Sequence, residues 1–197
     1  QCTLDIMPTW MLKEHVTITA PVLTNIVNAS IMSGEVPLAL KEAVVTPILK
    51  KPSANPEDLC NYRPVSNINV PGKILEQVVA KQLRTHLQDN DLLEPLQSAY
   101  RPQHSTETAL AKVYNDLTMA LDEKKIAILI LLDLSAAFDT IDHDILMNRC
   151  REVFGITNTA LEWIKSYMED RTQRVLIGNS SSEPRRLTCG VPQGSVL

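Results

Sequence analysis

The sequence lacks the motifs typical of zinc-binding proteins, of P-loop nucleoside triphosphatases and of membrane-spanning proteins. Its cysteines, at positions 2, 60, 150 and 189, show no CxxC spacing, and its four histidines complete no zinc pattern. We therefore expect reduced thiols in an intracellular compartment and no structural metal. No apolar run approaches a membrane span, and no secretory signal opens the chain. The phosphate-binding motif GxxxxGK[ST] is absent, because PGKI at 71 to 74 lacks the first glycine and the hydroxyl.

An overall excess of positive charge is also missing. The net charge of −4 does not indicate nucleic-acid binding, since proteins that neutralise phosphates are usually basic as whole domains. The distribution of charge is more informative. Residues 41 to 84 hold seven basic residues against four acids, and residues 165 to 186 hold five against three. Two basic segments therefore flank an acidic centre.

The chain is long enough to bury a substantial core, with 197 residues of which 44% are apolar. It starts at Gln1 and ends in GSVL after a glycine-rich turn, so we expect an internal fragment of a longer protein. It contains no internal repeat and no low-complexity tract.

Hydrophobic periodicity predicts a mixed α+β architecture without regular βαβ alternation. Helices are expected over 20–33, after Pro71, from Ser105 or Thr106, through 145–153 and over 158–169. Strands are expected over 43–51 and 126–133, and TQRVLIG and RRLTC should form a hairpin. The helix faces expected to be buried include Val22, Leu23, Ile26, Val27 and Ile31 in the first helix, Ile74, Val78, Val79, Leu83 and Leu87 in the second, and Ala109, Leu110, Val113, Leu117 and Leu121 in the third.

One acid at the end of an apolar run is the strongest candidate for chemistry. Residues 126 to 132 are apolar and lead directly into Asp133. A carboxylate there could cap the next turn, or it could bind Mg²⁺, which prefers carboxylate oxygen. Small residues and then Phe138 follow, leaving room for a ligand beside a bulky wall, although a core phenylalanine is the simpler interpretation. The later turn CGVPQGSVL is also ordinary by itself, but its glycines permit close backbone approach and Gln193 offers both a donor and an acceptor.

The combination of these segments is more specific than any one of them. LLDLSAAFDTIDH followed by GVPQGSVL resembles motifs A and B of reverse transcriptases, specifically those of non-LTR retrotransposons of the LINE type (the CR1, L2 and jockey-like groups). The resemblance continues upstream through TPILKK, NYRPVSNINVPGKILEQVVAKQL and LQSAYRPQHSTETAL in the family's order, and covers about residues 40 to 197.

This resemblance implies roles for individual residues. Asp133 and the Leu134 carbonyl would bind catalytic Mg²⁺, with Mn²⁺ as an alternative metal. Phe138 would be the steric gate under the incoming sugar. The remaining implied nucleotide-binding residues are Lys50, Arg63, Ser135, Ala136, Ala137 and Gln193, and the implied template or primer contacts are Arg101 and Gly194. Lys51 is a rival to Lys50, and a salt bridge within the protein is an equal alternative for Arg101. Asp139, Asp142 and His143 match the family pattern but are interpreted as turn and helix-cap residues.

The family also has an aromatic-Ala-Asp-Asp motif C downstream of motif B, and no such sequence occurs here. We therefore expect a right-hand polymerase fold with fingers and a partial palm, truncated before the motif C hairpin. The predicted segments are an N-terminal helical extension over 1–39, a fingers-like segment over 40–125 and a partial palm over 126–197.

The resemblance implies that the full-length parent is an RNA-directed DNA polymerase acting on an RNA template, a DNA primer and dNTPs. The fragment alone is expected to be inactive. No membrane partner is expected, and the family implies a nuclear and cytoplasmic location. A truncated remnant of the element that binds nucleic acid without catalysis is the alternative, because it would share every residue named above.

Overall fold

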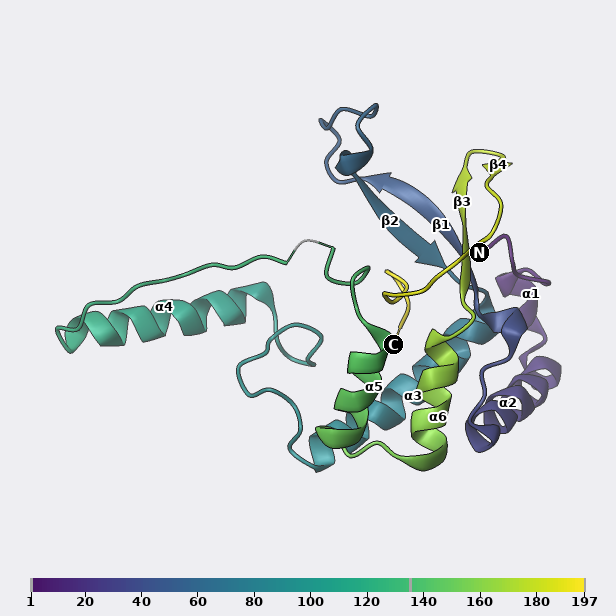
Figure 1. Cartoon of the computed structure of the whole chain (residues 1–197), viewed down its shortest axis with the longest axis horizontal. Helices are drawn as coiled ribbons and strands as arrows, with labels where there is room; N and C mark the ends of the chain where they lie inside the picture. Colours follow the sequence, from purple (N-terminus) through teal and green to yellow (C-terminus); the bar gives the residue numbers. More distant parts are fainter. Residues whose placement is uncertain (1, 135, 197) are drawn as a thin grey trace. The chain divides into compact units, whose positions relative to one another are not determined.

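The computed structural model describes residues 2–134 and 136–196. It is an α+β structure, as predicted (Figure 1). In chain order its elements are α1 Thr9–Glu14, α2 Val16–Ser33, a 3₁₀ turn Leu38–Leu40, β1 Glu42–Leu49, a 3₁₀ turn Leu59–Asn61, β2 Tyr62–Asn67, α3 Val70–Asp89, α4 Thr106–Asp122, α5 His143–Glu152, α6 Asn158–Met168, β3 Thr172–Ile177, β4 Ser180–Ser181 and β5 Arg185–Arg186.

The chain forms two compact units. The first comprises residues 1–86 together with 136–197, and the second comprises residues 87–135. Each unit is described by itself below. This division differs from the segment boundaries expected from the family resemblance, which remain a prediction.

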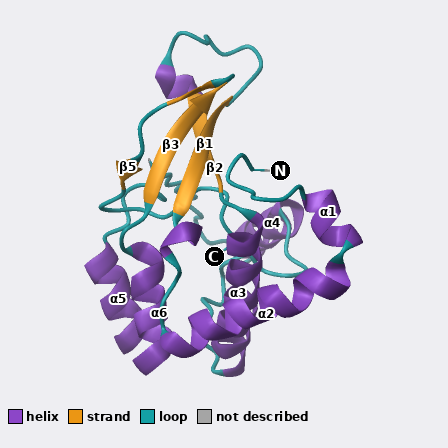
Figure 2. Ribbon diagram, turned by 90° about the vertical axis from the view of Figure 1, so that its right-hand side faces the viewer, coloured by secondary structure: helices purple, strands orange, loops and turns teal. Residues whose placement is uncertain are grey.

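The sheet of the first unit has strand order β2-β1-β3-β4 (Figure 1), with β5 also paired to β3 (Figure 2). β1 runs antiparallel to β2, with Val44 opposite Asn67, and parallel to β3, with Val45 opposite Val175. β1 supplies the buried apolar residues of the sheet because it lies between two neighbours, and Ala43, Val44 and Val45 are all at most 4% exposed. The predicted strand at 43–51 and the predicted C-terminal hairpin are both confirmed.

The main core of the first unit lies among α2, α3, α5 and α6. Its buried residues are Val27, Val36, Leu75, Cys150, Ile156, Trp163, Ile164, Tyr167 and Met168. Trp163 also donates a hydrogen bond from Nε1 to Ser30 Oγ at 2.9 Å, so its polar edge is satisfied inside the core. All four predicted helices in this unit are confirmed, but the predicted inner face of α2 is partly wrong, because Val22 is 57% exposed.

Helix α2 is apolar around much of its surface. By length and composition alone, its 18 residues reach what is needed to cross a membrane, contrary to the expectation from the sequence. Only 11% of that window is buried, and core helices of soluble proteins and signal sequences meet the same criterion, so this is weak evidence. Gly34 ends the helix in the left-handed conformation, as its position predicted.

The second unit contains α4, which begins as predicted. Ser105 and Thr108 form a reciprocal capping box at its start. The expected burial of one face is wrong, because Leu110 and Leu121 are each 63% exposed and no residue of α4 is buried. An apolar stripe predicts that one face of a helix packs against other residues, but it does not identify the segment that packs there.

The predicted strand at 126–133 is also wrong. Residues 126 to 134 form neither helix nor strand, and the large apolar residues of this run are 54% to 93% exposed. A strand is stable only when neighbours satisfy its backbone N–H and C=O groups. Within the described residues, no strand pairs with this segment. We call residues 126–134 the acidic-end run, because it leads into Asp133.

Candidate functional site

Two turns of the first unit are hydrogen-bonded to each other. Residues 136–142 form the turn before α5, which we call the gate turn because it contains Phe138. Residues 188–196 form a second turn, which we call the glutamine turn because it contains Gln193. The Val191 amide donates to the Phe138 carbonyl at 2.8 Å, and the Gly190 amide donates to the Ile141 carbonyl at 2.8 Å. The chain thereby joins two segments that are about fifty residues apart in sequence.

Gly190 is required at this junction for two reasons. Its φ of +78° lies in the left-handed region that L side chains rarely adopt. A Cβ at this position would also lie 2.8 Å from the Phe138 carbonyl oxygen and 2.9 Å from Asp139 Cα. These are backbone atoms that cannot move aside cheaply, so only glycine permits this approach.

Three side chains tie the two turns together further. Gln193 Nε2 donates to Asp139 Oδ2 at 3.1 Å, and the Cys189 thiol lies 3.4 Å from the Asp139 carbonyl. His143 Nε2 lies 2.8 Å from the Gly190 carbonyl. Because a carbonyl only accepts hydrogen bonds, this His143 nitrogen must carry the proton. His143 is therefore satisfied structurally, as predicted.

Asp142 confirms its predicted cap role. Its side chain accepts a hydrogen bond from the Ile145 amide at 3.0 Å, at the start of α5. A carboxylate there also interacts favourably with the positive end of the helix dipole. Asp139 lies in a turn, as predicted, with its amide donating to the Ala136 carbonyl at 2.9 Å, and its carboxylate also contacts the glutamine turn.

The glutamine turn also adds to the free edge of β2. The Ser66 amide donates to the Gln193 carbonyl at 2.7 Å. Gly194, with φ +102°, packs so close that a Cβ there would lie 3.2 Å from the Ser66 carbonyl oxygen. Beside this contact is a pocket of about 250 Å³, lined by residues of β2, β3, β5 and both turns. These residues include Pro64, Ser66, Asp139, Gln173, Arg186 and Gln193.

A buried carboxylate anchors the far end of the glutamine turn. Glu76 of α3 is 2% exposed, and its Oε2 accepts from the Val196 amide at 2.8 Å. Its Oε1 accepts from the Tyr167 hydroxyl at 2.7 Å. Burial, and then the negative charge of Glu76, raise the pKa of Tyr167, so the phenol stays protonated and keeps donating. Arg171 lies over the Tyr167 ring, 4.6 Å from its centroid.

The predicted phosphate-binding residues lie together near the tip of the β1–β2 hairpin. Arg63 is opposite Ile48, and the Lys50 amide continues the ladder by donating to the Asn61 carbonyl at 2.8 Å. Strand alternation places Lys50 on the same face as Ile48, and hence as Arg63. Both basic side chains are exposed, and the Lys50 ammonium donates to the Cys60 carbonyl at 2.8 Å.

The other predicted site residues are distributed between the two units. Asp133, Leu134 and Arg101 belong to the second unit, where Arg101 donates to the carbonyls of a neighbouring loop, namely those of Glu94, Pro95 and Gln97. Ser135 lies outside the described residues, and Ala136 and Ala137 are exposed in the gate turn. Among the described residues, no group of three or more His, Cys, Asp or Glu side chains could hold a metal ion.

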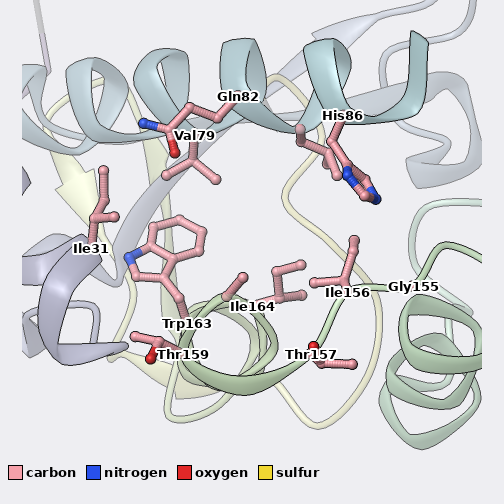
Figure 3. Close-up of a pocket in the computed structure, with 12 residues that line it drawn as sticks. Ile31, Val79, Gln82, His86, Gly155, Ile156, Thr157, Thr159, Trp163 and Ile164 are labelled. Atoms are coloured by element: carbon pink, nitrogen blue, oxygen red, sulfur yellow. The ribbon is translucent and has the colours of Figure 1, made fainter. Parts of the chain in front are cut away.

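A larger pocket in the first unit is apolar and has no arrangement for chemistry. It measures about 460 Å³ and lies between α3 and the start of α6, where Val79 and His86 face Ile156, Trp163 and Ile164 (Figure 3). His86 Nε2 lies 2.7 Å from the Phe154 carbonyl. The polar pocket beside the two turns is therefore the better candidate site.

Comparison with known proteins identifies the family. Residues 48–197 match the family model described as "Reverse transcriptase (RNA-dependent DNA polymerase)". The chain belongs to the reverse transcriptase family. The match covers most of the chain and includes β2, the gate turn and the glutamine turn. The family prediction made from the sequence is confirmed.

Relatives from retrotransposons agree with the predicted LINE type. The chain is 33% identical over 177 residues to the probable RNA-directed DNA polymerase from transposon BS of Drosophila melanogaster. It is 31% identical over 175 residues to the RNA-directed DNA polymerase from mobile element jockey of the same organism. Each match covers 89% of this chain and 19% of the relative, so the chain spans about a fifth of the length of these curated relatives. Reverse transcriptases generally use divalent metal ions.

Sequence reasoning missed the residues that support the glutamine turn. Ser66, Glu76 and Asp139 lie in segments matched to the family, but nothing in their spacing shows that they contact residues 188–196. The one available signal was Glu76, an acid among the apolar residues of a predicted helix. A buried acid of this kind needs donors, and it finds them in Tyr167 and Val196.

Proposed function

We propose that this chain forms the part of a LINE-type RNA-directed DNA polymerase that binds the incoming nucleotide. It would comprise the fingers and a partial palm of a right-hand fold. The observation that supports this most is the hydrogen-bonded joining of the gate turn to the glutamine turn beside β2. In a member of the reverse transcriptase family, this joining supports a shared site for Phe138 and Gln193, which belong to different motifs.

The residues of the first unit suit the incoming nucleotide. Phe138 is 42% exposed, so its ring is available to contact a sugar and to exclude a ribose 2′-OH. The exposed Ala136 and Ala137 leave room beside it, and Ser135 precedes them in sequence. Lys50 and Arg63 offer a mobile point charge and a planar fork for triphosphate oxygens. Gln193 would pack against the nascent base pair.

Asp133 and Leu134 would hold the metal. A carboxylate and a backbone carbonyl are hard oxygen donors, which fit Mg²⁺ and also Mn²⁺. Such an ion supplies charge stabilisation to the phosphates and lowers the pKa of the primer 3′-OH. One carboxylate does not complete a two-metal site, so we propose that a downstream acidic pair in the longer protein completes it.

The proposed partners are an RNA template, a DNA primer and dNTPs. Gly194, and Arg101 of the second unit, are the proposed contacts to template or primer backbone. A nuclear and cytoplasmic location is proposed from the retrotransposon family. The 197-residue chain by itself is proposed to be inactive.

The direct test is primer extension by a longer polymerase that contains this chain. Asp133→Ala should lower extension by about a thousandfold, since a metal ligand supplies several kcal/mol of transition-state stabilisation. Asp116→Ala, which removes an exposed acid paired with Lys112, is the matched control and should retain activity. Phe138→Ala should increase ribonucleotide incorporation relative to dNTP incorporation. Full activity of Asp133→Ala would refute the metal assignment, and inactivity of the unmodified polymerase together with RNA binding would favour the non-catalytic remnant.

A further inference from the structure

Gln193 is held by a neighbour to which the sequence assigned no role in the nucleotide site. Its amide nitrogen donates to Asp139, the residue directly after the proposed gate Phe138. An ionised carboxylate only accepts hydrogen bonds, so Asp139 fixes which end of the Gln193 amide faces it. The amide oxygen and the second N–H then remain for a ligand.

The backbone of the same turn is held from the other side by His143. Its protonated Nε2 donates to the Gly190 carbonyl, and the Gly190 amide itself donates to Ile141. Both peptide groups of this left-handed glycine are therefore fixed by residues of the gate turn or the first position of α5.

We propose that Asp139 and His143 are positioning residues that hold the glutamine turn in one conformation before the nucleotide arrives. This inference rests on the proposed function and deepens it, since it assigns the preorganisation of Gln193 to two residues of the gate turn and the α5 start. Neither residue needs to touch the substrate. Preorganisation of this kind lowers the cost of ordering the site when a ligand binds.

The first experiment measures amide hydrogen exchange by NMR in the 197-residue chain itself. Asp139→Leu and His143→Leu each remove a hydrogen-bonding partner while leaving a side chain of similar bulk. Exchange of the Ser66, Gly190 and Val191 amides should become about twofold to tenfold faster, which corresponds to the net worth of one hydrogen bond. The Val45 amide in the central strand should not change, because the effect is local to the turn.

The conservative variants test the hydrogen bonds separately from shape and charge. Asp139→Asn retains an acceptor for Gln193, and His143→Gln places a donor near the position of Nε2. Both should restore exchange to nearly the original rates. Unchanged turn exchange in the leucine variants would overturn the proposal, and so would equally fast exchange at Val45, because the two residues would then act on stability alone.

The second experiment measures steady-state kinetics with a longer polymerase. Asp139→Leu and His143→Leu should raise the KM for dNTP by about twofold to tenfold with a smaller change in kcat, and the conservative variants should restore KM. An unchanged KM in an active polymerase would overturn the proposal. If the unmodified polymerase is inactive, the proposed function fails, whereas the exchange experiment still decides whether the two residues hold the turn.

Discussion

The glutamine turn and the acidic-end run are both sequence motifs of one family, but they differ in how they are stabilised. The glutamine turn, residues 188–196, forms hydrogen bonds with β2, the gate turn, α3 and α5. Residues 126–134 have large apolar side chains that are 54% to 93% exposed and pair with no strand of the described chain. A turn can be completed by a few donors and acceptors of its own unit, whereas a buried strand needs neighbours on both sides.

The largest effect should come from core truncation, which also compares the two units. Leu75 in α3 is 2% exposed and Leu110 in α4 is 63% exposed. Leu75→Ala should lower the free energy of unfolding by about 2–5 kcal/mol, because it leaves a cavity in the first unit. Leu110→Ala should change it by less than about 0.5 kcal/mol. Urea unfolding monitored by far-UV circular dichroism measures both, because helices of both units contribute to the signal. Equal losses would contradict the contrast between the units.

The second largest effect should come from substituting Gly190, the glycine where the two turns meet. Gly190→Ala adds left-handed strain and a backbone clash, which together should cost about 2–4 kcal/mol. Gly178→Ala is the matched control, since φ is +59° there but no atom lies within 4 Å of the added Cβ. It should cost about 1 kcal/mol from strain alone. A Gly190 variant no less stable than the Gly178 variant would show that the two turns do not approach as described.

The buried anchor of the glutamine turn gives a smaller effect. Tyr167→Phe removes one donor from the buried Glu76 carboxylate and should cost about 1–3 kcal/mol in unfolding free energy. Tyr114→Phe, at a position 72% exposed, should cost almost nothing. If chemical denaturation gave the two variants the same stability, Glu76 would not depend on Tyr167.

The smallest effect concerns pH. Burial lowers the pKa of Lys41 from its usual 10.5, although Asp170 partly opposes this. The unfolded chain therefore binds more protons than the folded one in the alkaline range below 10.5, and folding stability gains as the pH rises through that window. Lys41→Met should be more stable at pH 7, by about 1 kcal/mol or less, and this advantage should shrink toward pH 10. Thermal unfolding at both pH values measures it, and an advantage that grew with pH would contradict the assignment.

Local sequence signals predicted most elements of the first unit. Gly34 ends α2, the β-branched residues of 43–49 form β1, and Asp142 caps α5, because each depends on a few neighbouring residues. The wrong predictions concern segments that need another segment to pack or pair with them. The periodicity of α4 and the apolar run before Asp133 were visible in the sequence, but no described segment covers or pairs with them. The contacts of Gln193 with Asp139 and Ser66 depend on topology, which residue spacing does not reveal.

Backbone hydrogen exchange across the whole chain tests the central contrast most directly. If the glutamine turn is held by its hydrogen bonds and the acidic-end run is unpaired, the amides of Ser66, Gly190 and Val191 should be protected from hydrogen exchange. Those of residues 126–134 should exchange at the rates of an unstructured peptide. Protection across 126–134, or unprotected amides at Gly190 and Val191, would contradict this account.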